Sequence, residues 1–316
     1  MEINKIYNES CLDTLSKMPN NYIDCVITSP PYWQLRDYGY DGQWGLEPSF
    51  NEYLEHLWLL MDAIYLKLKD GGTVWVNLGD TYMGGVAGQG GDCGKHTIEN
   101  ASIKGTRFVG EKKKGLPNKS LCLIPHRFAI GCIDRGWIVR NDIIWAKRNG
   151  MPESVVDRFS KKHEYFFFMV KSEKYYFNLD AVRSKHIHAN DKRNNGERHI
   201  YKDGVKSLNN DMLATNAVSF NPLGKNPGSV SDFWDIPTKP SSNEHYAAYN
   251  DELIKKPILA GCPENGIIYD PFMGTGSTAE AALRANRKFI GSEMSEKYCK
   301  IADDRLSPLF NQIKLF

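Results

Sequence analysis

The sequence lacks any long apolar run. None of its apolar stretches reaches the roughly 20 residues needed to span a bilayer, and the N-terminus lacks the pattern of a signal peptide. We therefore expect a cytoplasmic protein without a membrane partner.

Cysteines are few and follow no pattern. The seven are odd in number and scattered, and several lie within apolar runs, which predicts buried thiols in a reducing compartment. Cys93 and His96 have a ligand-like spacing, and His186 and His188 form a pair, but no second pair completes a zinc site. We predict no metal.

A strong excess of one charge is also missing, because a net charge of +2 is too small to indicate a nucleic-acid-binding protein by itself. Basic residues are nevertheless concentrated in the glycine-rich stretch 84–119, where seven face only three acidic ones. They are Lys95, Lys104, Arg107, Lys112, Lys113, Lys114 and Lys119. The stretch predicts a mobile loop that neutralises phosphates and closes over DNA. The alternative is a solvated loop without a role.

Two well-known phosphate-binding loops are absent. The chain has no G-x-G-x-x-G beside its glycine turn, which argues against NAD or FAD, and no lysine-ending P-loop, which argues against a nucleoside triphosphate. Residues 267–278 instead form an apolar strand ending in Asp270, a turn with Gly274 and Gly276, and the start of an alanine-rich helix. Such glycines let the backbone approach a ligand closely. Glu293 ends the next strand, where an acid can bind ribose hydroxyls.

The most informative segment is 28–33, which follows an apolar strand. Pro30 and Pro31 lack backbone donors and fix the chain, so we expect a rigid segment with outward carbonyls. Ser29 and the Pro30 carbonyl could then accept the two hydrogens of a base amino group, while Tyr32 stacks on the ring. The alternative is a proline-rich turn after a core strand.

Together the two motifs resemble the amino-methylating DNA methyltransferases that use S-adenosylmethionine (AdoMet), in the permuted order called the β class. In that family Ser/Asp/Asn-Pro-Pro-Tyr/Phe/Trp is the catalytic motif and Asp-Pro-Phe-x-Gly-x-Gly the AdoMet motif. Here they lie at 28–33 and 270–276. The resemblance also covers the segments 8–13, 71–80 and 245–257. Within the last of these, Asn250 stands where relatives often carry proline.

The resemblance implies AdoMet as the cofactor and suggests which residues hold it. Asp270, Gly274 and Gly276 would hold the methionine end. Phe272 would pack on the cofactor, and Glu293 would bind the ribose. Asp13 would approach the adenine amine, unless it caps a helix at 13–18. His245, in the segment that precedes the glycine turn, completes the expected cofactor residues.

Alternating strands and helices predict an α/β fold with a mostly parallel sheet covered on both faces. The resemblance makes this a Rossmann-like methyltransferase sheet in circularly permuted order. The expected strands are 22–28, 72–78, 137–147, 163–170, 266–270 and 288–293, and the expected helices are 50–69, 121–135, 251–261, 278–287 and 295–306. Both motifs follow strand ends, so they can meet although about 240 residues separate them.

Three parts of the chain are expected: a catalytic half at 1–170, a small insertion at 171–242 and an AdoMet-binding half at 243–316. The resemblance places target recognition in the insertion, where polar side chains can contact phosphates and base edges. These include Lys185, Lys192, Arg193, Asn194, Asn195, Arg198 and Lys202. The alternative is an exposed linker with solvated charges.

The implied activity is site-specific methylation of a flipped base in double-stranded DNA. A serine before Pro-Pro-Tyr leans towards cytosine N4 in the family, and an aspartate towards adenine N6, so N4 is the prediction and N6 the first alternative. Because this pocket also serves RNA and protein methylation, those activities and a non-catalytic DNA-binding module remain further alternatives. The order Cys262-Pro263 is the reverse of that in carbon-methylating enzymes. A homodimer and a cognate restriction endonuclease are left open.

Overall fold

One mixed sheet organises the chain. The computed structural model describes residues 1–84, 116–150, 153–183, 232–238 and 251–313. Their strands form an eight-stranded sheet in the order β1-β8-β7-β2-β3-β5-β4-β6. The strands are β1 (Lys5–Tyr7), β2 (Ile23–Thr28), β3 (Leu68–Leu78), β4 (Ile138–Ala146), β5 (His163–Val170), β6 (Phe233–Asp235), β7 (Ile267–Asp270) and β8 (Lys288–Ser292). All neighbours pair in parallel except β5, which is antiparallel to both β3 and β4.

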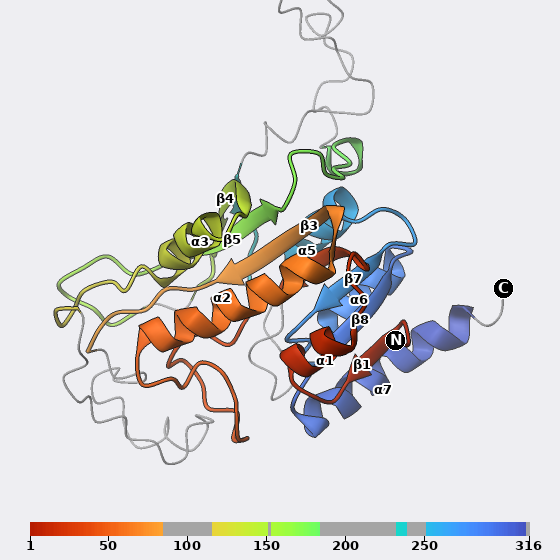
Figure 1. Cartoon of the computed structure of the whole chain (residues 1–316). Helices are drawn as coiled ribbons and strands as arrows, with labels where there is room; N and C mark the ends of the chain where they lie inside the picture. The colour runs from red at the N-terminus through yellow and green to blue at the C-terminus, as the bar shows by residue number, and fades with distance from the viewer. Residues whose placement is uncertain (85–115, 151–152, 184–231, 239–250, 314–316) are drawn as a thin grey trace, which may run out of the picture. The chain divides into compact units, whose positions relative to one another are not determined.

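Helices cover both faces of the sheet (Figure 1). The first face carries α1 (Cys11–Lys17), α2 (Phe50–Lys67) and α3 (Ile124–Asp134). The second carries α5 (Asp251–Gly261), α6 (Ser277–Arg284) and α7 (Glu296–Ile313). The predicted α/β architecture with a mostly parallel sheet is therefore confirmed.

The alternation of strand side chains explains the two layers. Successive side chains of a strand point to opposite faces. In β3, Val74 and Val76 pack among the helices of the first face, while Trp75 packs among those of the second. Because both faces are covered, these strands are almost continuously apolar, as parallel strands in such folds usually are.

Polar caps set the start of two helices on the first face. Ser49 Oγ accepts a hydrogen bond from Glu52 N (3.2 Å) and begins α2, and Ser10 Oγ accepts from Asp13 N (3.2 Å) and begins α1. Loss of such a cap typically costs about 1 kcal/mol. The alternative role of Asp13 as a cap of a helix at 13–18 is thus wrong, because the helix begins at Cys11 and Ser10 caps it.

The topology brings the two motifs to one edge. β2 and β7 are parallel neighbours, with Val26 opposite Tyr269. Thr28 and Asp270 therefore end adjacent strands at the same edge. Because β5 is antiparallel to β3, its first residues reach this edge as well. We call this side of the sheet, where the parallel strands have their carboxyl ends, the active edge.

All the expected strands and helices are found, with ends shifted by a few residues, and α7 runs on to Ile313. The sequence did not predict two strands, β1 and β6, which are each only three residues long. The chain divides into two compact units, residues 1–178 with 232–316, and residues 179–231. Of the second unit the structure describes 179–183, with a short 3-10 helix at Asp180–Val182. β6 lies within the expected insertion 171–242 but belongs to the sheet of the first unit.

Two further expectations concern composition. The six cysteines in the described ranges are all buried and free, as expected of structural thiols. Among the described helices, none is long and apolar enough to cross a membrane.

Candidate active site

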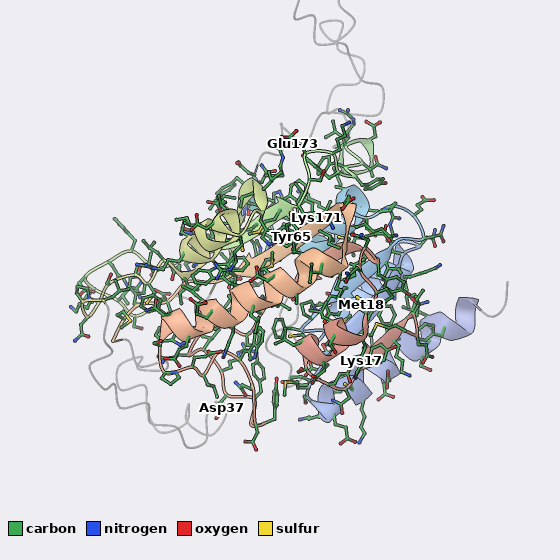
Figure 2. The ribbon with its side chains drawn as sticks, in the orientation of Figure 1. Lys17, Met18, Asp37, Tyr65, Lys171 and Glu173 are labelled. Atoms are coloured by element: carbon green, nitrogen blue, oxygen red, sulfur yellow. The ribbon has the colours of Figure 1, made fainter. Side chains whose placement is uncertain are left out.

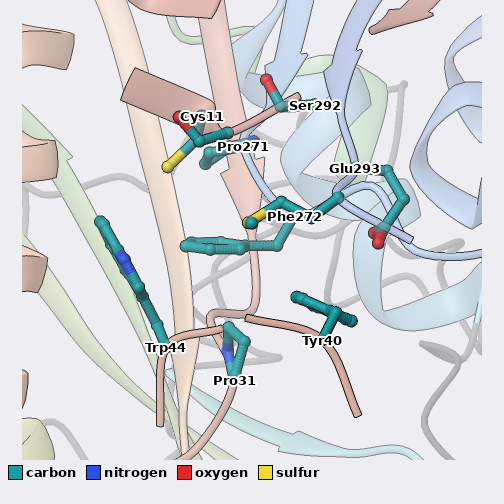
Figure 3. A pocket seen from close by; sticks show the side chains of 10 residues that line it. Cys11, Pro31, Tyr40, Trp44, Pro271, Phe272, Ser292 and Glu293 are labelled. Atoms are coloured by element: carbon teal, nitrogen blue, oxygen red, sulfur yellow. The ribbon is translucent and has the colours of Figure 1, made fainter. Parts of the chain in front are cut away.

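A hollow at the active edge joins the two motifs. About 360 Å³ of space, open solvent included, lies between its walls, and Figure 3 shows side chains from separate parts of the chain converging on it. It is lined by Ser10, Cys11, Pro31, Tyr40, Trp44, Pro271, Phe272, Ser292, Glu293 and Met294. Pro31 belongs to the proline motif, whereas Pro271 and Phe272 belong to the glycine-turn motif. The two motifs therefore share one hollow, as their places at strand ends predict.

Glu293 forms one wall and is held by backbone donors. Its Oε2 accepts from Gly274 N (2.8 Å) and its Oε1 from Ser295 N (2.8 Å). Burial raises the pKa of this carboxyl, and the two backbone hydrogen bonds oppose the rise. Gly274 has a φ of 55°, and a Cβ there would meet open space, so glycine serves the left-handed turn. The remaining lone pairs of Glu293 can serve a ligand's hydroxyl groups.

Asp270 lies beneath the turn rather than in the wall of the hollow. It is only 1% exposed, and it accepts hydrogen bonds from Phe272 N (3.0 Å) and from Thr278 Oγ1 (2.6 Å). Burial raises its pKa to about 6 against the lowering effect of these bonds. The buried Thr28 hydroxyl, at the end of β2, also opposes the rise of this pKa. It makes no hydrogen bond of good geometry to the described residues. Asp270 thus ties the strand end to both ends of the glycine turn.

Gly276 serves the packing of two helices. Its φ is 82°, and a Cβ at this position would lie 2.9 Å from Ala302 Cβ of α7. The approach of its backbone to a ligand stays a prediction, and the structure adds a second reason for glycine, because the missing side chain would point at α7. The glycine thus lets α6 and α7 approach each other.

Neither of the two remaining expected cofactor residues is placed at the hollow. Asp13 is exposed, accepts a hydrogen bond from Ser10 Oγ (2.7 Å) and is not among the lining residues. Its neighbours Ser10 and Cys11 line the hollow instead. His245 lies outside the described residues.

Tyr40 and Trp44 are site residues that the sequence analysis missed. The Phe272 ring lies between them (Figure 3), and its centroid is 5.4 Å from that of Trp44. Both belong to residues 34–48, which we call the strap. Two buried side chains support it from within: Gln43 Oε1 accepts from Tyr38 N (2.6 Å) and Glu47 Oε2 from Gly45 N (2.9 Å). The only hint in the sequence is an aromatic, glycine-rich stretch directly after the proline motif.

The proline motif presents two acceptors. Ser29 is partly exposed, and neither its Oγ nor the Pro30 carbonyl has a hydrogen-bond partner among the described residues. The Pro31 carbonyl accepts from Tyr53 Oη (2.8 Å), which fixes the segment against α2. Trp33 is buried and donates from Nε1 to the Glu47 carbonyl (3.0 Å), so it packs in the core and does not line the hollow.

Tyr32 is pinned across two strands. Its hydroxyl lies 3.0 Å from Asn77 Oδ1 of β3 and 2.8 Å from Glu164 Oε2 of β5, and its single hydrogen is donated to one acceptor at a time. Glu164 also pairs with Lys147, which follows β4. A Cβ on Gly79 would lie 2.6 Å from the Tyr32 ring, so the ring packs directly against the backbone there. The ring orientation is thus fixed by β3 and β5 at the active edge.

Comparisons with known proteins agree with this geometry. A family model described as DNA methylase, covering N6 and N4 methyltransferases, matches residues 23–304, and the chain belongs to this family. The chain is 33% identical to the type II methyltransferase M.Cfr9I of Citrobacter freundii over 95% of this chain and 87% of that protein. It is 31% identical to M.SmaI of Serratia marcescens over 96% and 90%.

Solved structures show the same fold. The PvuII DNA methyltransferase (cytosine-N4-specific) superposes with a TM-score of 0.61 at 17% identity, over 98% of this chain and 92% of that one. A putative DNA modification methylase from Thermus thermophilus, solved with S-adenosyl-L-methionine, gives a TM-score of 0.56 at 17% identity, over 96% and 93%. The chain is therefore an AdoMet-dependent DNA methyltransferase with a Rossmann-like sheet in the permuted motif order.

Proposed function

We propose that this chain methylates the N4 amino group of a cytosine flipped out of double-stranded DNA, as the modification enzyme of a type II restriction–modification system. The observation that carries the proposal is the pair of unpartnered acceptors, Ser29 Oγ and the Pro30 carbonyl, directly beside the hollow that Pro31 lines; both lack partners among the described residues. The relatives are named type II methyltransferases, which supports the biological setting.

The kinds of residues that line the hollow suit AdoMet. Bound AdoMet supplies an electrophilic methyl group on a cationic sulfur. Glu293 would accept hydrogen bonds from the ribose hydroxyls with the lone pairs that Gly274 and Ser295 leave free. Trp44, Tyr40 and Phe272 would provide aromatic surfaces for the adenosine part. Asp270 acts through the turn that it holds.

The proline motif activates the amine. The lone pair of an exocyclic base amine is delocalised into the ring, so the amine is a poor nucleophile. Hydrogen bonds from the two amino hydrogens to Ser29 Oγ and the Pro30 carbonyl favour a more tetrahedral nitrogen and localise the lone pair. The same acceptors stabilise the positive charge that develops on nitrogen during methyl transfer. The pinned Tyr32 ring stacks on the flipped base and holds the amine in line.

Cytosine N4 is favoured over adenine N6 by the serine that opens the motif and by the similar solved structure that is named cytosine-N4-specific. Adenine N6 is the alternative, because the acceptor pair serves either amine. A homodimer and a cognate endonuclease are further proposals that follow from the family resemblance.

Product analysis tests the proposal directly. The purified chain is incubated with AdoMet and unmethylated bacterial DNA, the DNA is digested to nucleosides, and the product is identified by mass spectrometry, while sequencing maps the modified sites. We expect N4-methylcytosine at one short sequence. N6-methyladenine would overturn the base assignment and keep the mechanism. The absence of any methylated base would contradict the proposal and favour RNA or protein substrates, or DNA binding without catalysis.

A separate prediction concerns the pinning of Tyr32. Tyr32→Phe and Glu164→Gln should each lower kcat about 10-fold, because each removes the charge-assisted hydrogen bond that fixes the ring. The double variant should be little worse than either single one, since both remove the same contact. AdoMet affinity should not change, because neither residue lines the hollow.

Glu173→Gln is the matched control for this pair. Glu173 is exposed and follows the carboxyl end of β5, far from the strap residue Asp37 (Figure 2). The kcat of this variant should therefore equal that of the wild type. Additive losses in the double variant, or a fall in AdoMet affinity, would contradict the pinning role of Glu164.

A further inference from the structure

Two apolar side chains in the described ranges are almost fully exposed. Val156 is 103% exposed and Phe159 is 96% exposed, whereas the next large apolar side chain, Ile130, is 59% exposed. Both lie in the connection between β4 and β5, of which residues 147–150 and 153–162 are described; we call it the β4–β5 loop. Single exposed apolar residues are common on protein surfaces, but two almost fully exposed ones that lie three residues apart in one loop favour a contact surface.

The loop stands at the active edge. Ala146 and His163 pair at its base, and Lys147 N donates to the Lys162 carbonyl (2.8 Å). The next residue along β5 is Glu164, which binds the Tyr32 hydroxyl. The exposed pair is therefore carried by the same strands that fix the ring on which the target base stacks.

The loop is held in place by contacts on its sides. The Arg158 guanidinium lies 4.0 Å from the Tyr82 ring centroid and donates to Glu153 Oε2 (2.6 Å). Lys119 Nζ lies 2.5 Å from Asp157 Oδ2. Val156 and Phe159 flank these anchored residues, so their side chains project from a supported loop.

The charge of the loop indicates the partner. Residues 147–162 contain five basic and two acidic side chains. A loop that combines an excess of basic residues with two exposed apolar side chains suits duplex DNA, because basic groups attract phosphates and apolar side chains can meet the faces of unstacked bases. An apolar protein partner would not need this excess of positive charge.

We propose that Val156 and Phe159 form an apolar wedge that enters the base stack of duplex DNA beside the target nucleotide. The wedge rests on the proposed function, because a base can reach Ser29 only after it leaves the duplex. The wedge replaces the stacking that the neighbouring bases lose when the target flips. It acts on base extrusion and not on the methyl-transfer step.

Single-turnover methylation tests the wedge. The substrate is a duplex carrying the site mapped by product analysis, and the variants are Val156→Ala, Phe159→Ala and the double variant. We expect the double variant to methylate the matched duplex roughly 10- to 100-fold more slowly, as loss of base–side-chain stacking predicts. A duplex with a mismatch at the target should restore the rate to within about 3-fold of the wild type, because a mispaired base is extruded at lower cost.

Leu66→Ala is the matched control, since Leu66 is 58% exposed near the end of α2, away from the active edge. A fluorescent base analogue next to the target gives an independent readout, and its signal on flipping should fall in the double variant and persist in the control. If the double variant matches the wild type on the matched duplex, or if the mismatch restores nothing, the wedge is wrong. If the wild type methylates no DNA at all, the proposed function fails instead.

Discussion

Replacing Ser29 by alanine should lower kcat by about 100- to 1,000-fold, the loss typical when one preorganised transition-state hydrogen bond is removed. The Ser29 hydroxyl has no partner among the described residues, so its removal disturbs no hydrogen bond that the fold uses there. Because Ser29 does not line the cofactor hollow, AdoMet affinity should remain that of the wild type. Steady-state kinetics and a cofactor titration by calorimetry separate the two effects.

Ser16→Ala provides the matched control. Ser16 is exposed on α1 and donates only to the Asp13 carbonyl within its own helix, so both activity and AdoMet affinity should be preserved. Ser29→Cys retains the size of the side chain but accepts hydrogen bonds weakly, and it should recover little activity. Equal losses of activity and AdoMet affinity in Ser29→Ala would show that the residue supports cofactor binding. They would contradict the proposed hydrogen bond between the base amino group and Ser29.

The sequence predicts the placement of both motifs for a physical reason. β2 and β7 are buried on both faces, so each is a nearly unbroken apolar run that ends where the special chemistry begins. Ligands of such sheets collect at the carboxyl ends of strands, which places Ser29 and Asp270 at one edge from the pattern of the chain alone. The short strands β1 and β6 have no such pattern, since three residues show no period and owe their conformation to the strands beside them.

The supporting side chains of the site could not be predicted in the same way. Tyr32 meets Asn77 and Glu164, which are 45 and 132 residues away in the sequence, and only the antiparallel course of β5 brings Glu164 to the active edge. The same holds for Trp44, which reaches the hollow because Glu47 braces the strap through contacts with Gly45 and Trp33. Such contacts depend on tertiary packing and leave no local pattern.

The structure also adds supporting roles within the predicted set. Asp270 and Gly276 are predicted to hold the methionine end of AdoMet, and their contacts in the structure show that both shape the turn that presents Phe272. Ser10 lines the hollow, whereas Asp13 does not. Residue type and spacing identify the right turn, but they do not distinguish a side chain that faces a ligand from one that holds the loop around it.

Replacing Asp270 by alanine should weaken AdoMet binding about 10- to 100-fold, because the buried Thr278 hydroxyl and Phe272 N–H both lose their acceptor and the turn relaxes. Asp270→Asn keeps the shape and should lie between the alanine variant and the wild type. The exposed Asp303 of α7 makes no such contact, so Asp303→Ala is the matched control and should bind AdoMet as the wild type does. Unchanged affinity in Asp270→Ala would refute the role of Asp270.

The pH dependence of binding follows from the raised pKa. Burial raises the pKa of Asp270 in the folded protein to about 6 from an ordinary value of 3.8, so the protonated form is favoured by folding. The contribution of Asp270 protonation to the free energy of unfolding is therefore complete below pH 3.8. It is lost as the pH rises through about 6. Cationic AdoMet prefers the ionised form, so wild-type affinity should strengthen as the pH rises through about 6, by at most about 10-fold per pH unit. Asp270→Asn has no such group to titrate and should give a flatter profile across the same range. If the wild type and Asp270→Asn show the same change of AdoMet affinity with pH, another carboxyl titrates. The first candidate is Glu293, which lies at the wall of the hollow and has a raised pKa of its own.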